Sequence, residues 1–141
     1  MTTRAMIRPT VLAVIRRNDD LLVFEGHDSV KQQTFYRPLG GGIEFGETAE
    51  SALRRELREE LAVELGEVEL LQVVENIFQY EGGSGHEIVF LYAAEVADPA
   101  FYDREHLGTV LDSGSTVLWL PVKDVVEGNA ILYPDELVNL L

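Results

Sequence analysis

The order of apolar and polar residues along the chain predicts a protein rich in β-strands. Two apolar runs, residues 11–15 and 21–24, flank the polar triplet Asn18-Asp19-Asp20, a pattern typical of a hairpin. Branched and aromatic residues, which favour strands, gather in four further segments. These are residues 34–37, 68–80, 87–96 and 116–120, the second and third of which are joined by a glycine-rich turn and are expected to form a hairpin.

A different periodicity predicts one long helix over residues 49–65, with Gly66 as its stop signal. Short helices are expected at residues 121–126 and 134–141, and a loop at residues 101–115. Strands and helices do not alternate regularly, which argues against a Rossmann fold or barrel. We therefore predict an α/β fold in which helices cover a mixed sheet, built as one domain over residues 1–141.

Composition and charge narrow the classes of protein that fit this pattern. Of the 141 residues 46% are hydrophobic, enough for a sizeable core, and none is cysteine, which excludes disulfides, a thiol nucleophile and a cysteine-ligated zinc. The longest apolar stretch, residues 88–94, is too short to cross a membrane, so we expect a cytoplasmic protein without membrane partners. The formal charge of −14 repels nucleic acid, and a phosphate-handling protein this acidic needs divalent cations or a few placed arginines.

The predicted long helix concentrates glutamates beside its apolar seam. At about 100° per residue, Glu56, Glu59 and Glu60 fall within one arc, next to three leucines suited to pack on a sheet. Glu56 and Glu60 form a like-charge pair, whereas Arg54 and Arg58 are expected to face solvent. Clustered carboxylates of this kind suit Mg²⁺ or Mn²⁺. The competing interpretation is an ordinary solvated helix face laced with salt bridges.

The segment before this helix adds a glycine run, Gly40-Gly41-Gly42, and two more acids, Glu44 and Glu47. A glycine run lets the backbone approach a ligand or a helix closely, although alone it indicates only a turn. Together with the helix, residues 41–63 resemble the Nudix box, which reads Gly, five residues, Glu, seven residues, Arg-Glu-aliphatic-any-Glu-Glu-any-Gly-aliphatic. Every specified position matches except the last glycine, which is Ala62 here. If that residue must be left-handed, the alanine costs about 1 kcal/mol.

The resemblance implies a Nudix-like α/β/α sandwich with a mixed sheet, one long catalytic helix and short C-terminal helices. It implies metal-dependent hydrolysis of a pyrophosphate bond in a nucleoside diphosphate linked to another group, with Mg²⁺ or Mn²⁺ as cofactor. The residues that it assigns are Glu56, Glu59 and Glu60 with the Gly41 carbonyl as metal ligands, and Arg55 as the partner of Glu47 at the loop–helix junction. Glu87 is an additional candidate metal ligand.

The motif does not identify the general base or the substrate contacts as clearly as it identifies the metal ligands. Glu56 is the first candidate for the base, and acids from the later loop, Asp103, Glu105 and Asp112, are the alternatives. Arg37 is placed either to hold a phosphate or to form a structural salt bridge. Three aromatic residues are candidates to stack on a base, with packing in the core as the competing role: Phe35, Tyr36 and Tyr80.

Two marks within the family bear on the substrate. Where ADP-ribose hydrolases carry a proline after the box, this chain has Phe78, whereas Tyr80 stands where dinucleoside polyphosphate hydrolases carry a tyrosine. The alternative function is a catalytically silent Nudix module that binds a nucleotide. An isoprenoid diphosphate isomerase would need a cysteine, which the chain lacks. The sequence leaves the oligomeric state open, a homodimer included.

Overall fold

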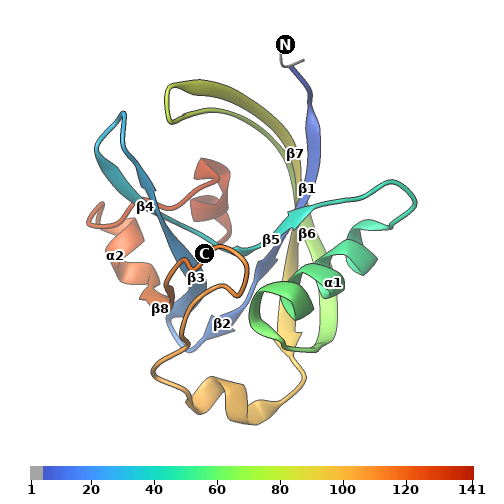
Figure 1. The fold of residues 1–141 in the computed structure, drawn as a ribbon. Coiled ribbons are helices and arrows are strands. Elements are labelled where there is room, and N and C mark those ends of the chain that lie inside the picture. The colour runs from blue at the N-terminus through green and yellow to red at the C-terminus, as the bar shows by residue number, and fades with distance from the viewer. Residues whose placement is uncertain (1–4) are drawn as a thin grey trace.

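The computed structural model describes residues 5–141 and shows two four-stranded sheets (Figure 1). The first sheet has the order β5-β1-β7-β6, in which β1 and β7 are parallel and the other neighbours antiparallel, so it is mixed as expected. Its strands are β1 (Arg8–Val14), β5 (Leu39–Gly42), β6 (Leu65–Tyr80) and β7 (Gly83–Val96). The second, antiparallel sheet contains β2 (Arg16–Arg17), β3 (Asp20–Asp28), β4 (Gln33–Arg37) and β8 (Val117–Pro121).

Strand β1 separates two hydrophobic clusters because successive side chains point to opposite faces of a sheet. Val11 and Ala13 pack with the leucines of α1 (Ala49–Leu61). Leu12 and Val14 pack on the other side with α2 (Val122–Val126) and the 3₁₀ helix η2 (Asp135–Leu140). Figure 1 shows α1 and the C-terminal helices on opposite sides of β1. The α/β fold predicted from the sequence, with helices on both sides of strands, is confirmed.

The long helix is shorter than the sequence predicts. It ends at Leu61 rather than at residue 65, because Ala62 adopts the left-handed conformation (φ 56°, ψ 38°) and Leu65 already begins β6. The prediction that Arg54 faces solvent is also wrong. Its guanidinium donates to the carbonyl oxygens of Leu65 and Gly66 at 2.7 and 2.9 Å, which ties the helix to the start of β6.

Two further expectations near the N-terminus need correction. The glycine run is not a loop but strand β5, whose Gly41 pairs with Val11 of β1. The polar triplet does close a hairpin, yet its first arm is the short β2, while residues 11–14 belong to β1 in the other sheet. Pairing partners distant in the sequence decided both outcomes, and local patterns do not contain that information.

The second predicted hairpin is confirmed as β6 and β7, which pair over most of their length and turn at Glu81 and Gly82. In Figure 1 this hairpin curves over toward the tip of the β3–β4 hairpin. The expected loop after β7 includes a 3₁₀ helix, η1 (Pro99–Asp103). Within residues 5–141, none of the helices has the length and apolar character needed to span a membrane.

Candidate active site

Helix α1 presses its acidic face against the glycine strand β5. A Cβ at Gly41 would lie 2.5 Å from the carboxyl carbon of Glu56, so a larger residue there would displace that carboxylate. One turn further along the helix, Glu60 accepts a hydrogen bond of 3.0 Å from the backbone N–H of Gly40. The glycine run and the glutamates that the sequence singled out are therefore in direct contact.

Burial makes these carboxylates unlike ordinary surface acids. Glu60 is 7% exposed, and burial, followed by the nearby charge of Glu56, raises its pKa from 4.5 to about 8. Burial also raises the pKa of Glu56, although Arg55 partly opposes that shift. Glu59 is exposed and accepts a hydrogen bond of 3.2 Å from Arg55. The site thus holds two half-buried or buried acids and one at its rim.

Arg55 joins the helix to the segment before it. Its guanidinium donates to both carboxylate oxygens of Glu47 at 2.8 and 2.9 Å, and to the carbonyl oxygen of Gly42 at 3.0 Å. This bidentate pair, together with the Glu44 N–H, lowers the pKa of Glu47 from 4.5 to about 2. The predicted contact between Arg55 and Glu47 is confirmed, and it fixes β5 relative to α1.

The donor set fits a divalent cation of the Mg²⁺ or Mn²⁺ type. Glu56 and Glu60 offer carboxylate oxygens, the ligands these ions prefer, and burial raises the pKa of both groups because it penalises their charged forms. Within residues 5–141, however, no three histidine or acidic side chains already converge as a ready cage. Glu56 and Glu59 instead face Arg55. Arg55 therefore also holds two of these carboxylates in place.

The loop after η1 approaches the same carboxylates. The N–H of Leu111 donates to the carbonyl oxygen of Glu60 at 2.9 Å, and the negative charge of Asp112 contributes to the raised pKa of Glu56 and Glu60. Glu105 lies 3.6 Å from Arg17 in an ion pair. Among the three later-loop acids that the sequence left open, the structure brings Asp112 to the site.

A pocket of about 480 Å³ lies beside these carboxylates. Residues of the β3–β4 hairpin and of the β6–β7 hairpin line this pocket, together with residues of β1 and of the glycine strand β5. Of the predicted site residues, the pocket contains Gly41, Glu60, Glu87, Arg37, Phe35 and Tyr80. Phe35 meets Tyr80 edge to face at 6.0 Å between ring centroids and lies 5.5 Å from the ring of Tyr133.

Two predicted site residues, Arg37 and Glu87, contact each other. They form an ion pair of 2.8 Å with little exposure on either side, and Asn76 lies 3.4 Å from the same Glu87 oxygen. The structural salt bridge that the sequence left open for Arg37 is thus present. Tyr36 does not belong to the pocket, because alternation along β4 turns it away from Phe35 and into the cluster around Leu132 and Leu137.

Comparisons with known proteins agree with this geometry. The family model described as NUDIX domain matches residues 6–139. The chain belongs to the Nudix family. A NUDIX hydrolase from Nitrosomonas europaea has a similar fold, with a TM-score of 0.67 and 21% identity over 96% of this chain and 85% of that one. A MutT NUDIX hydrolase from Burkholderia pseudomallei has a TM-score of 0.56 and 22% identity over 84% of this chain and 85% of that one. At these identities the two structures support the fold.

Membership makes this Nudix protein a hydrolase that acts on pyrophosphate bonds. Its Nudix box departs from the family pattern at one residue, and the structure explains what the departure involves. Ala62 is the residue in place of the final glycine, and it is left-handed, as the C-caps of helices often are. Its N–H donates to the carbonyl oxygen of Arg58 at 2.9 Å.

Several residues of the Nudix pocket were not predicted from the sequence as parts of the site. They are separated from the box in the sequence and have no motif of their own: Arg8, Thr10, Asn76, Phe78 and Tyr133. Thr10 is 2% exposed, and within residues 5–141 its hydroxyl has no hydrogen-bond partner. Alternation along β6 could have found Asn76, Phe78 and Tyr80 as one set, because they share a face of that strand.

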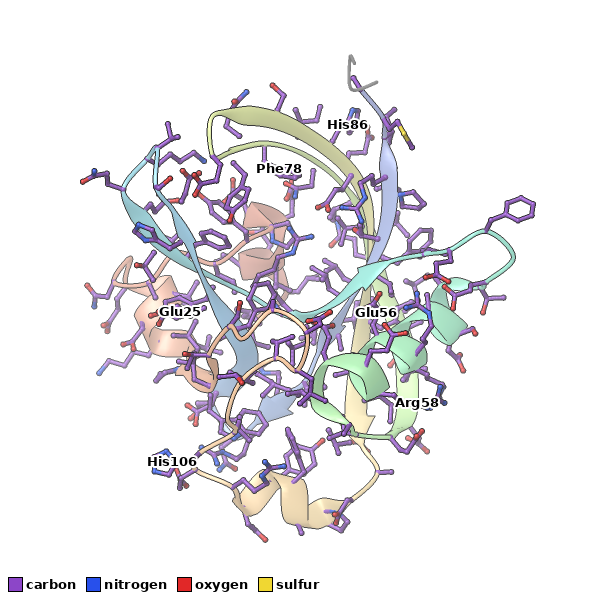
Figure 2. All side chains as sticks on the ribbon, in the orientation of Figure 1. Glu25, Glu56, Arg58, Phe78, His86 and His106 are labelled. Carbon is purple, nitrogen blue, oxygen red and sulfur yellow. The ribbon has the colours of Figure 1, made fainter. Side chains whose placement is uncertain are left out.

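Figure 2 shows how labelled side chains lie around the Nudix site. Glu56 projects from α1 on the side of β5, while Arg58 points outward from the helix. Phe78 lies under the curved β6–β7 hairpin. His86 and His106 lie at opposite ends of the molecule.

Proposed function

We propose that this Nudix hydrolase cleaves a pyrophosphate bond in a nucleoside diphosphate linked to another group, with Mg²⁺ or Mn²⁺ as cofactor. The observation that carries the proposal is Glu60, a buried carboxyl group in a cluster of acids with the backbone N–H of Gly40 as its hydrogen-bond partner. Such a group is costly to keep charged unless a cation compensates it. A purely structural role for this position would favour an apolar residue.

The residues that would hold the cation are Glu56, Glu59 and Glu60, with the carbonyl oxygen of Gly41. When bound, the cation would offset charge on the phosphates and favour ionisation of the attacking water. Glu56 is our choice for the proton acceptor, because its carboxylate lies beside Gly41, which lines the pocket, and because burial raises its pKa. Arg55 fixes the position of α1 relative to the segment around Glu47 through two hydrogen bonds.

The nucleoside end would occupy the pocket beside these carboxylates. Phe35 and Tyr80 offer aromatic surface to a planar base, and Thr10 offers a buried hydroxyl that has no hydrogen-bond partner among the residues that the structure describes. Arg37 brings a positive charge to the pocket, and its ion pair with Glu87 neutralises part of that charge. We propose that Glu87 orients Arg37 in addition to serving as a candidate metal ligand.

A substrate panel tests this proposal. Purified protein is incubated with nucleoside triphosphates, nucleotide sugars and dinucleoside polyphosphates, each with Mg²⁺, Mn²⁺ or EDTA, and products are resolved by chromatography. We expect cation-dependent cleavage of at least one class, loss of that activity in Glu60→Gln, and retention in the exposed control Glu69→Gln. Tight nucleotide binding without cleavage in any cation would instead support the silent binding module.

A further inference from the structure

The tip of the β3–β4 hairpin and the tip of the β6–β7 hairpin are joined by hydrogen bonds to two acidic side chains. The carboxylate of Asp28, at the end of β3, accepts the N–H of Glu81 at 3.2 Å. In return the carboxylate of Glu81, in the β6–β7 turn, accepts the N–H of Ser29 at 2.7 Å and the Ser29 hydroxyl. We call this reciprocal contact of Asp28, Ser29 and Glu81 the clasp.

Asp28 also accepts hydrogen bonds from the backbone of its own turn. It is 1% exposed and accepts the N–H groups of Val30 and Lys31 at 3.0 Å each. These backbone donors lower the pKa of Asp28, so it stays ionised at neutral pH. Glu81 is exposed and has a positive φ of 52°. The clasp therefore joins one buried acid, which three backbone N–H groups contact, to one acid at an exposed turn.

The clasp joins two parts of the fold that belong to different sheets. Strands β3 and β4 lie in the antiparallel sheet, whereas β6 and β7 lie in the mixed sheet. Between them lies the pocket, whose walls include Gly26, Phe35, Phe78 and Tyr80. Phe35 from one hairpin and Tyr80 from the other meet edge to face right beside the clasp, and the Tyr80 hydroxyl lies 3.5 Å from the carbonyl oxygen of His27.

Gly26 shows that the pocket wall is closely fitted. A Cβ at this position would collide with the ring of Phe35, so the ring lies directly on the backbone of β3. Phe35 cannot shift toward β3 to accept a wider ring. The hydrogen bonds at the tips join the two hairpins that carry Phe35 and Tyr80.

We propose that the clasp of Asp28, Ser29 and Glu81 fixes the width of the pocket, and so selects substrates that carry a planar heterocycle without taking part in bond cleavage. This inference rests on the proposed function, since it concerns the nucleoside end of the same site. The clasp residues are positioning residues, and they act through Phe35 and Tyr80. Loss of the clasp should weaken binding of the heterocycle and leave the carboxylates of α1 as they are.

Glu81→Ala is the test variant, because Glu81 is exposed and its removal spares the buried Asp28. Glu81→Gln is the conservative variant, since an amide oxygen still accepts the Ser29 N–H. Glu69→Ala is the matched control, an exposed acid on β6 whose loss changes the net charge equally. Hydrogen exchange of the tip amides, in the absence of any ligand, reports whether the clasp has opened.

Two probes separate the clasp from the chemistry. Calorimetry with ribonucleoside 5′-monophosphates measures binding of the heterocycle, and inorganic pyrophosphate with Mg²⁺ measures binding at the carboxylates. We expect Glu81→Ala to weaken nucleotide binding about tenfold, with unchanged pyrophosphate binding, while Glu81→Gln and Glu69→Ala resemble wild type. With a substrate from the panel, KM should rise while kcat stays within about twofold.

Unchanged nucleotide affinity in Glu81→Ala, despite faster exchange at the tips, would overturn the inference. Equal weakening of pyrophosphate and nucleotide would do so too, because it would indicate a general loss of structure. Failure of the proposed function looks different: the wild type would bind nucleotides but cleave none, and the effect of the clasp on affinity would still be measurable.

Discussion

The guanidinium of Arg55 holds the carboxylate of Glu47 through two hydrogen bonds, of 2.8 and 2.9 Å, across the junction between β5 and α1. The same guanidinium also reaches Glu56 at 3.1 Å and Glu59 at 3.2 Å. One arginine therefore positions the backbone of the glycine strand and two of the acids proposed as cation ligands. Its removal should affect the fold and the site together.

Arg55→Ala should lower both the melting temperature and the affinity for Mg²⁺. The pKa of Glu47 falls from 4.5 to about 2 in the folded protein, so its contribution to stability is present above pH 4.5 and is lost as the pH drops toward 2. The variant should therefore lose less stability over that window than wild type does. Thermal unfolding between pH 2 and 6 measures this, with Arg58→Ala, which loses an exposed ion pair, as the control. Identical acid dependence in the two variants would contradict the assignment.

Glu60→Gln should nearly abolish activity and stabilise the cation-free protein at high pH. The pKa of Glu60 rises from 4.5 to about 8 on folding, so the folded state holds its proton more tightly than the unfolded state. Its effect is neutral below pH 4.5 and becomes destabilising as the pH rises toward 8. The glutamine keeps an acceptor for the Gly40 N–H and does not ionise.

Urea unfolding in EDTA at pH 5 and pH 9 checks this prediction. Wild type should lose stability between the two values, and Glu60→Gln should lose less. In wild type, binding of Mg²⁺ should release a proton near neutral pH, which calorimetry in buffers of different ionisation enthalpy detects. Parallel pH dependence in wild type and variant would show that Glu60 is already ionised at neutral pH.

Ala62→Gly should raise the free energy of unfolding by about 1 kcal/mol, since glycine adopts the left-handed conformation without the steric cost of a Cβ. Ala49→Gly makes the same chemical change at the first residue of the helix, where the conformation is right-handed, and should be destabilising. Urea unfolding at pH 7 compares the two. A loss of stability in both variants would mean that the αL position of residue 62 carries no strain.

Asp112→Asn should move the acidic limb of the pH–rate profile to lower pH while kcat at the optimum stays within a few-fold of wild type. The charge of Asp112 contributes to the raised pKa of Glu56 and Glu60, so its removal lowers both. Glu105→Gln, whose acid pairs with Arg17, is the matched control and should leave the profile unchanged. A fall in kcat of about 100-fold in Asp112→Asn would instead make Asp112 the proton acceptor.

The sequence by itself determined the features that depend on spacing along one element. The placement of Glu56, Glu59 and Glu60 follows from the helical period, and the contact of Arg55 with Glu47 follows from the motif that joins them. The long β6–β7 hairpin is likewise visible in the alternation and in its turn. In each case the interacting residues are close in the sequence or repeat with a regular period, so the pattern itself carries the geometry.

Tertiary structure alone decided the contacts between elements distant in the sequence. Arg37 meets Glu87 because β4 and β7 face one pocket, and Asp28 meets Glu81 because two hairpins of different sheets end at the same place. Helix α1 ends at Leu61 and not at the predicted residue 65, because Leu65 belongs to β6 and pairs with β7. Such contacts depend on how sheets pack and pair, and no local period encodes which distant strands become neighbours.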